Sequence, residues 1–403
     1  MVRPTSRVSR VLVTGPLVPF ADAYREKAEK RGYSPLSAVN LQRQVAQMSR
    51  WLVAERLGIE ELSEACVEAF LTAQRASGRE RSVSRPGLLC LLELLRELGV
   101  VTAPVHPAPS PTAALMGSFG GYLLSERGLS ASTVRGYVDR ATRFMAGLAP
   151  GGLAQVTPAE VTAAVLRESA AVSVSATQNF VASLRAFLRF CFVEGLIEID
   201  LSQAALAVTG RRRSSLPRGI AKSDADALLA SCDRRTAIGR RDFAVIITLL
   251  RLGLRRGEVA GLKLEDIDWR AGELVVVGKG ARLDRLPLPV DVGEAIAAYL
   301  RRGRPASDRR LVFLQARAPF EPIAPGTVAS TVRRACRRAG VAEVGSHRLR
   351  HTAACEMVAA QVPLAEIAQV LRHRSLQSTA IYARVDLDRL RLLAQPWPGG
   401  GSR

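Results

Sequence analysis

The apolar positions of the chain divide it into two helical segments and a mixed segment. Between residues 17 and 208 they follow the period of amphipathic helices, with four helices expected in each half. Beyond residue 218, one apolar helix is expected over Asp242–Leu252, ending at Gly253. Two strands of a hairpin are expected over Glu273–Val277 and Leu286–Val290. Further helices are expected over Thr327–Ala339, Ser346–Ala360, Leu364–Leu371 and Ser378–Ala383, with Thr327 and Ser346 as N-caps.

Two linkers separate these segments. Residues 102–113 (TAPVHPAPSPTA) are rich in proline and predict an extended spacer, while residues 210–219 (GRRRSSLPRG) suit a strap along a phosphate backbone. The predicted organisation is an N-terminal helical domain over 1–104, a linker over 105–113, a second helical domain over 112–208, a basic linker over 209–217, a mixed domain over 218–395 and a tail over 396–403.

The two helical domains resemble copies of one another. The run Arg31–Ser34 (RGYS) recurs 96 residues later as Arg127–Ser130 (RGLS), and Gly99 recurs at the same spacing as Gly195. In each copy a short third helix is expected after an N-cap, at Ser63 and at Thr157, and a closing helix ends at the glycine. The predicted fold is therefore two all-α four-helix domains followed by a mixed α+β domain with a small β-hairpin. Chance similarity of amphipathic helices is the alternative.

Charge narrows the partner. The 403 residues include 57 Lys and Arg against 37 Asp and Glu, a net charge of +20. This excess of positive charge indicates a polyanionic partner, nucleic acid before membrane. A high-GC genome, whose proteins are rich in arginine, would also raise the net charge. The longest apolar run, Phe243–Leu250, is too short to span a bilayer. The six cysteines form no CxxC pair and are expected to be reduced core residues. We expect a cytoplasmic protein, because a DNA-binding protein belongs there and Gly15, Pro16 and Pro19 interrupt the apolar run that could have formed a signal peptide.

Residues with the chemistry to act on phosphate concentrate near the end of the chain. His347 and Arg350 are three residues apart, hence on one face of a helix, and His351 is expected to support them by packing or capping. An arginine can bind phosphate through two of its N–H groups, histidine and lysine can transfer protons, and a phenol can act as a nucleophile. The candidate site residues are Arg255, Lys279, His347, Arg350, His373 and Tyr382. Taken singly, each has an ordinary interpretation, such as a surface ion pair between Arg255 and Glu258.

The order and spacing of these residues resemble the tyrosine recombinases, the phage-integrase family, over residues 218–390. The segments that carry the resemblance are GLRRGEVAGLKLEDID, VGKGARLDRLPL, HRLRHTAA and LRHRSLQSTAIYARV. The helical domains resemble the family's core-binding domain, which normally occurs once, so the second copy is a departure. Arg372 is a second departure, because the family usually has glycine immediately before the histidine that corresponds to His373. Arginine at this position adds charge and restricts the backbone.

The resemblance implies a site-specific DNA recombinase or integrase of the transposon or integrative-element type. Tyr382 would attack a DNA phosphodiester and form a 3′-phosphotyrosyl link, with no metal and no cofactor. Arg255 and Arg350 would stabilise the transition state, and His347 would assist deprotonation of the tyrosine. Lys279 would protonate the leaving oxygen, and His373 would hydrogen-bond the phosphate. The implied partners are double-stranded DNA, a homotetramer assembled on it, and other recombinases of the same element, with no membrane.

Several alternatives stay open at the level of sequence. They are an Xer-like resolution recombinase, a catalytically silent DNA-binding regulator, a type IB topoisomerase-like relaxase and a metal-dependent transposase. For the N-terminal copy, added DNA contact is favoured over protein contact, because its first half carries Arg25, Arg31, Arg43, Arg50 and Arg56.

Overall fold

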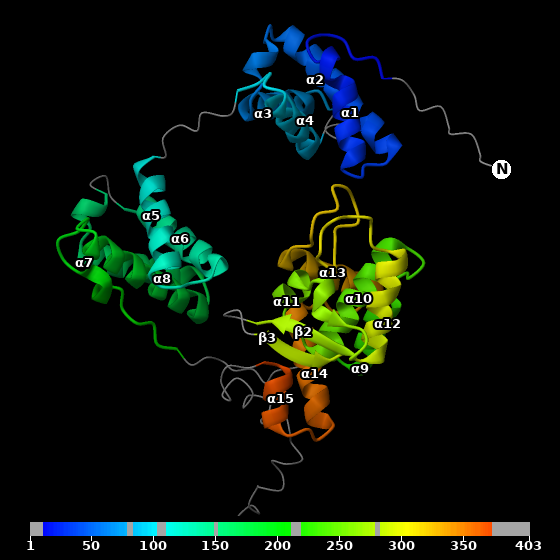
Figure 1. Ribbon diagram of the computed structural model, residues 1–403. Helices are drawn as coiled ribbons and strands as arrows, with labels where there is room; N and C mark the ends of the chain where they lie inside the picture. The colour runs from blue at the N-terminus through cyan, green and yellow to red at the C-terminus, as the bar shows by residue number, and fades with distance from the viewer. Residues whose placement is uncertain are drawn as a thin grey trace, which may run out of the picture. The chain divides into compact units, whose positions relative to one another are not determined.

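The computed structural model describes residues 11–78, 84–102, 110–148, 152–210, 219–278 and 283–372, and it is mostly helical with one small antiparallel sheet (Figure 1). Residues 104–214 form one compact unit, and the rest of the chain forms the other. The unit that includes both ends of the chain contains three separate apolar clusters, one within residues 11–102 and two within residues 219–372. We therefore describe a first helical segment (11–102), a second helical segment (110–210) and a mixed segment (219–372), each by itself.

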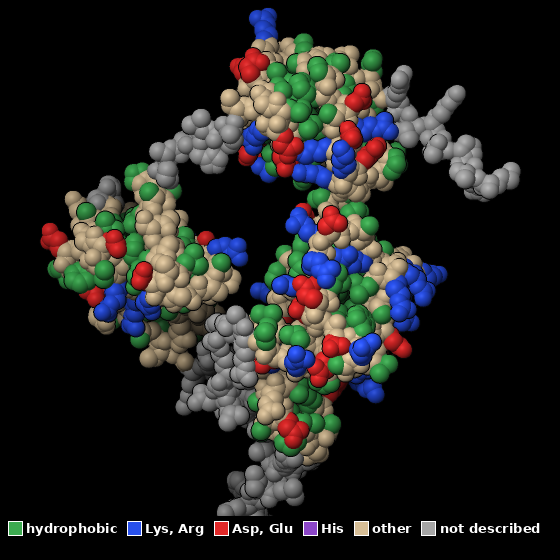
Figure 2. All heavy atoms as spheres, viewed as in Figure 1, with side chains coloured by type: hydrophobic (Ala, Val, Ile, Leu, Met, Phe, Trp, Pro, Cys, Tyr) green, Lys and Arg blue, Asp and Glu red, His purple; other side chains and the backbone are tan. Residues whose placement is uncertain are grey.

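The first helical segment contains four α-helices around one core. They are α1 (Ala21–Lys30), α2 (Pro35–Ala54), α3 (Glu64–Ala76) and α4 (Arg85–Glu97), with short 3-10 turns η1 (Val18–Phe20) and η2 (Ile59–Glu61). The predicted cap at Ser63 is confirmed, because its side chain accepts a hydrogen bond from the backbone N–H of Cys66. Tyr24, Phe70 and Leu91 are among the buried side chains. Figure 2 shows basic and acidic side chains interspersed on its surface.

The second helical segment also contains four α-helices. They are α5 (Pro111–Ser125), α6 (Ala131–Ala146), α7 (Pro158–Ala171) and α8 (Val174–Val193), with 3-10 turns η4 (Leu153–Gln155) and η5 (Leu201–Ala204). Thr157 caps α7 as predicted, and the carboxylate of Glu160 accepts from the Thr157 backbone in return. An edge-on contact of the Phe119 and Phe187 rings, with centroids 5.2 Å apart, lies in the core.

The mixed segment packs helices around the buried helix α10 (Ala237–Leu252) (Figure 1). It contacts α9 (Lys222–Ala230), α11 (Arg256–Gly261), α12 (Val290–Arg302), α13 (Pro325–Ala339) and α14 (Ser346–Ala359). The 3-10 turn η6 (Leu264–Asp266) leads into strands β1 (Ile267–Asp268), β2 (Glu273–Val277) and β3 (Leu283–Pro287), and α15 (Leu364–Val370) closes the described chain. The sheet order is β1-β2-β3, antiparallel, with Glu273 opposite Pro287 and Val277 opposite Leu283.

The structure corrects several boundaries. Strand β2 is confirmed, but β3 lies three residues before its predicted position, because helix α12 begins at Val290 after Pro289. Helix α10 begins at Ala237, where Thr236 is the N-cap, rather than at Asp242. The predicted caps Thr327 and Ser346 are wrong: Ala324 and Gly345 occupy those positions without side-chain caps. The predicted helix Ser378–Ala383 lies outside the described residues.

The described segments also bear on membrane spanning and on the state of the cysteines. None of the helices within the described ranges is long and apolar enough to cross a membrane. The six cysteines are free thiols, and all but Cys355 are buried, as expected for core residues.

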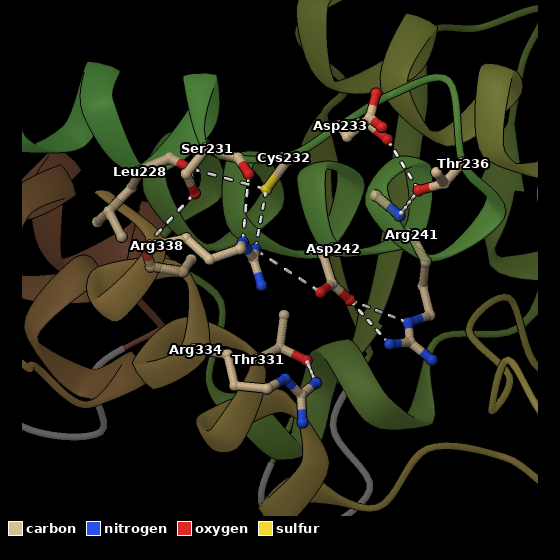
Figure 3. A network of polar contacts seen from close by, with 12 residues as sticks. Leu228, Ser231, Cys232, Asp233, Thr236, Arg241, Asp242, Thr331, Arg334 and Arg338 are labelled. Carbon is tan, nitrogen blue, oxygen red and sulfur yellow. Dashed lines mark hydrogen bonds and ion pairs between the residues drawn. The ribbon is translucent and has the colours of Figure 1, made fainter. Parts of the chain in front are cut away.

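A buried polar network ties α9, α10 and α13 together (Figure 3). The carboxylate of Asp242 on α10, 1% exposed, accepts from the guanidinium of Arg241 at 2.8 Å and lies 3.9 Å from that of Arg338 on α13. Arg338 also donates to the carbonyl of Ser231 at the end of α9, and Arg241 donates to the carbonyl of Leu314. Because two cations converge on one buried carboxylate, removing that carboxylate leaves their charge uncompensated.

We therefore expect Asp242→Asn to destabilise the fold by about 3–5 kcal/mol, the usual cost of breaking a buried ion pair from one side. Urea unfolding followed by circular dichroism measures this loss. Asp233→Asn is the matched control, because Asp233 pairs with Arg235 at 2.9 Å on the exposed surface, where little change is expected. Equal stability of the two variants would contradict a structural role for the network.

Candidate active site

Gly253 forms the turn between α10 and the first candidate site residue, Arg255. It ends α10 in the left-handed region, with φ of 57°, and Arg255 follows as the N-cap of α11. A Cβ atom at this position would lie 2.7 Å from the side chain of Leu371. Only glycine therefore combines this turn with so close a contact to the end of α15.

Arg350 projects from α14 into the interior and is 2% exposed. Its Nη1 donates to the carbonyl of Gly253 at 2.6 Å, and its Nη2 donates to the carbonyl of Leu371. One guanidinium thus joins the end of α10, the start of α14 and the end of α15. The fixed fork of the guanidinium suits these two acceptors, because its N–H groups point in set directions.

Arg255 lies beside Arg350 but keeps 41% of its side chain exposed. Its Nη1 donates to Oε1 of Glu258 at 2.7 Å, its backbone N–H donates to Oε2 at 2.7 Å, and its Nη2 donates to the carbonyl of Arg372 at 3.2 Å. The predicted support of Arg255 by Glu258 is therefore present in the structure. Arg255 is both held in place and accessible, as a phosphate-binding arginine must be.

Glu258 is shared with a second cation. Nη2 of Arg372 donates to Oε2 of Glu258 at 2.8 Å, and the side chains of Arg372 and Glu258 are 4% and 6% exposed. Burial alone would raise the pKa of Glu258, but the charge of Arg372 and the hydrogen bonds from Arg255 bring it below its ordinary value. The carboxylate is therefore ionised at neutral pH.

His347 and His351 lie one turn apart on α14, with ring centroids 4.4 Å apart and the rings edge to face. Burial, with the charges of Arg350 and Arg255, lowers the pKa of His347. Burial and the neighbouring His347 lower the pKa of His351 to about 4. His347 is consequently neutral near pH 7, the state in which an imidazole can accept a proton.

A pocket of about 420 Å³ opens beside these groups. Its lining includes the three described site residues Arg255, His347 and Arg350 together with Arg256 and Arg333. The structure thus brings together residues almost 100 positions apart in the sequence. Arg256 and Arg333 were not singled out by the sequence, because in an arginine-rich chain nothing in their spacing separates them from surface arginines. The site residues Lys279, His373 and Tyr382 lie outside the described residues.

Comparison with known proteins identifies the group to which this arrangement belongs. The model described as "Phage integrase family" matches residues 218–389, and that described as "Phage integrase, N-terminal SAM-like domain" matches residues 117–195. The integrase/recombinase y4rA of Sinorhizobium fredii is 37% identical over 393 residues, which cover 96% of this chain and 95% of y4rA.

The chain belongs to the phage integrase family. It is accordingly a tyrosine-type site-specific recombinase. The tyrosine recombinase XerD of Mycobacterium tuberculosis is 29% identical over 303 residues, which cover 70% of this chain and 95% of XerD. Among solved structures, the XerH recombinase bound to its difH substrate shares 17% identity with a TM-score of 0.57 and covers 73% of this chain and 99% of its own. The latter likeness establishes a shared fold.

The depressed pKa of His351 makes the stability of this integrase depend on pH. The unfolded chain binds a proton at His351 near pH 6.5, whereas the folded chain binds it only near pH 4. Stability is therefore lost as the pH falls through this window. We expect His351→Gln to lose less stability than the wild type between pH 7 and pH 4.5, as measured by urea unfolding at each pH. Parallel pH profiles of the two proteins would show that His351 titrates normally.

Proposed function

We propose that this integrase cuts and rejoins double-stranded DNA through Tyr382. The phenolic oxygen attacks a DNA phosphodiester, a 3′-phosphotyrosyl bond forms, and the bond to the 5′-oxygen breaks. Attack by a 5′-hydroxyl of another strand reverses these steps, so the phosphate bond energy is conserved and no cofactor is consumed. The observation that carries the proposal is the convergence of Arg255, His347 and Arg350 on one pocket.

The described residues suit the charge changes of this reaction. Negative charge accumulates on the non-bridging oxygens of the pentacoordinate phosphorus, and Arg255 and Arg350 are placed to stabilise it. Neutral His347 accepts the proton of the phenol, whose ordinary pKa near 10 leaves it a weak nucleophile at neutral pH. The remaining roles come from the family resemblance: Lys279 protonates the 5′-oxygen, and His373 hydrogen-bonds the phosphate. Because protein cations serve the phosphate, no metal ion takes part.

Assembly and biological setting follow from the same chemistry. Exchange between two duplexes breaks four strands, and each subunit supplies one nucleophile, so we propose a homotetramer on DNA. The mobile-element setting, with transposition or integration in the cytoplasm and other recombinases of the element as partners, is favoured over Xer-like resolution. A catalytically silent DNA-binding regulator is the remaining alternative. A covalent protein–DNA adduct, tested next, would exclude it, and the absence of an adduct would support it.

Tyr382→Phe is expected to bind DNA with near-normal affinity but to form no covalent protein–DNA adduct on a nicked suicide substrate. The substitution removes the attacking oxygen and almost no volume. Denaturing gel electrophoresis measures the adduct, on a duplex carrying the sequence that the full-length chain protects from nuclease. The wild-type adduct should also form in excess EDTA; restoration of a lost adduct by added Mg²⁺ would overturn the metal-free mechanism.

Tyr299→Phe is the matched control. Tyr299, which precedes the basic run RRGR, is the alternative nucleophile. Its ring is buried and stacks on Phe313, and its hydroxyl accepts from the backbone N–H of Leu314 at 3.2 Å. Burial also raises the pKa of this phenol, which disfavours the phenolate. The Tyr299→Phe variant should retain the adduct. An adduct in Tyr382→Phe that disappears in Tyr299→Phe would reverse the assignment.

We also propose that the first helical segment is a duplicate of the second. In both segments a residue in the left-handed region precedes the second helix and another follows the fourth, and these four glycines fall in two pairs spaced 96 residues apart: Gly32 with Gly128, and Gly99 with Gly195. The N-caps Ser34 and Ser130 repeat the same spacing. XerD, which is matched over nearly its whole length, leaves about 30% of this chain uncovered, as expected if relatives of that kind carry one copy.

Ion pairing distinguishes the two copies. Residues 11–78 and 84–102 contain ten basic and ten acidic side chains, and residues 110–148 and 152–210 contain seven of each. Among these described residues, six cations of the first segment lie in ion pairs, against Arg143 alone in the second. The second segment therefore offers more uncompensated cations to a phosphate backbone. This supports the proposal that the second segment, which directly precedes the catalytic domain in the sequence, grips the DNA duplex together with it.

For the first segment, these ion pairs leave Arg43, Arg50 and Arg56 for the proposed DNA contact, and the first two of these lie on one helix. Arg25 pairs with Glu29 and Arg31 with Glu93, whereas Arg43 and Arg50 are exposed on α2 at positions i and i+7, hence on one face. Each phosphate contact contributes roughly 0.9 to the log–log salt slope of DNA binding.

We expect Arg43→Gln with Arg50→Gln to lower the salt slope by up to about 1.8 while leaving adduct formation intact. The slope is obtained from DNA-binding isotherms at salt concentrations from about 50 to 300 mM, over which the affinity falls measurably. Arg25→Gln is the control, because its charge is compensated by Glu29. An unchanged slope and an unchanged nuclease footprint in the double variant would assign this segment to protein contact instead.

A further inference from the structure

Both described arginines of the active site hold the end of α15. Arg350 donates to the carbonyl of Leu371, and Arg255 donates to the carbonyl of Arg372. These two residues directly follow the last turn of α15, whose terminal carbonyls need partners from outside the helix. The site therefore positions the chain immediately before His373 through two consecutive backbone carbonyls.

Arg372 occupies this place at a conformational cost. Its φ of 54° lies in the left-handed region, which glycine enters freely and an arginine does not. Its Nε is buried and has no hydrogen-bond acceptor among the described residues. A strained residue with an unsatisfied donor is not selected for stability, and such residues concentrate at functional sites.

Two contacts of Arg372 lead back to Arg255. Its carbonyl accepts from Nη2 of Arg255, and its Nη2 donates to the Glu258 oxygen that also accepts from the Arg255 backbone. Its Nη1 donates to the carbonyl of Val370 at 2.8 Å, which fixes the guanidinium against its own helix. Arg255, which is partly exposed, is thus held both directly and through Glu258.

Charge gives the same arrangement a second consequence. Arg255 and Glu258 alone form a neutral pair, and a neutral pair attracts a phosphate weakly. With Arg372 the buried group carries one net positive charge, to which Arg350 adds another on the neighbouring helix. Asp284 of β3 is the further acidic residue whose charge acts on Arg372, and its effect is smaller than that of Glu258.

We propose that Arg372 is a positioning residue that holds Arg255 in its phosphate-binding orientation and gives the Arg255–Glu258–Arg372 group a net positive charge. This inference rests on the proposed phosphotyrosyl chemistry. It assigns to Arg372 no contact with the reacting atoms. The strain at Arg372 is then retained because the charge and the orientation of Arg255 depend on an arginine at this position.

Three variants separate charge from backbone conformation. Arg372→Gly removes the charge and the strain, Arg372→Asn removes the charge in a residue that tolerates the left-handed region, and Arg372→Lys keeps the charge and the strain. The measurement is the single-turnover rate of adduct formation on the nicked duplex, alongside DNA affinity and thermal unfolding of each full-length variant. Arg235→Gln, which breaks the exposed pair with Asp233, is the control.

We expect the Gly and Asn variants to form the adduct at least about tenfold more slowly, because a transition-state donor is misplaced by their change. Their DNA affinity should change little, and the Gly variant should unfold at the same or a higher temperature than the wild type. Arg372→Lys should recover most of the rate. Wild-type rates in the Gly and Asn variants would overturn the proposal, as would rate losses that merely follow losses of thermal stability.

A neutral methylphosphonate at the cleaved position tests the charge directly. The rate loss of Arg372→Gly should be smaller on this duplex than on ordinary DNA, because the substrate no longer carries the negative charge that the group attracts. Equal losses on both duplexes would overturn the charge assignment. Absence of an adduct from the wild type itself would instead overturn the proposed function, so the two failures are distinguishable.

Discussion

The guanidinium of Arg350 is the interaction on which the active site depends. It is almost fully buried, and it joins the carbonyl of Gly253 to that of Leu371. These acceptors end α10 and α15, so one side chain on α14 fixes the position of Arg255 on one side and of the approach to His373 on the other. Gly253 favours this arrangement, because its backbone is left-handed and a Cβ there would lie 2.7 Å from Cδ2 of Leu371, which would have to move. The arginine that we propose to stabilise the phosphate is therefore also a structural one.

Buried charge in the mixed segment occurs in two groups with different consequences. In the first, Asp242 is shared by Arg241 and Arg338 and ties together α9, α10 and α13. In the second, Glu258 is shared by Arg255 and Arg372 and lies at the site. Each has one carboxylate between two guanidiniums, and each therefore carries a net positive charge. Both groups have one partly exposed guanidinium, Arg338 at 40% and Arg255 at 41%, but Arg255 is the one that lines the pocket, where its charge can reach a ligand.

Much of the fold and part of the site could be predicted from the sequence. The i, i+3 spacing of His347 and Arg350 fixes a shared helical face, and the caps Ser63 and Thr157 follow from local chemistry. The position of β3 could not be predicted from its own apolar residues, because the start of α12 decides where the strand ends. Arg256 and Arg333 reach the pocket through tertiary packing alone, which no local pattern encodes. The placement of Lys279, His373 and Tyr382 stays a prediction.

Arg372 shows how a local rule can fail for a reason that the tertiary structure supplies. The end of a helix such as α15 favours glycine in the left-handed region, and an arginine there opposes that preference. That preference concerns backbone conformation alone. The side chain of Arg372 also pairs with Glu258 of α11, 114 positions earlier, and its carbonyl accepts from Arg255. None of the twenty amino acids combines the conformational freedom of glycine with a positively charged side chain. The chain therefore keeps the strain where glycine would leave Glu258 paired with Arg255 alone, and the site gains charge at the expense of local stability.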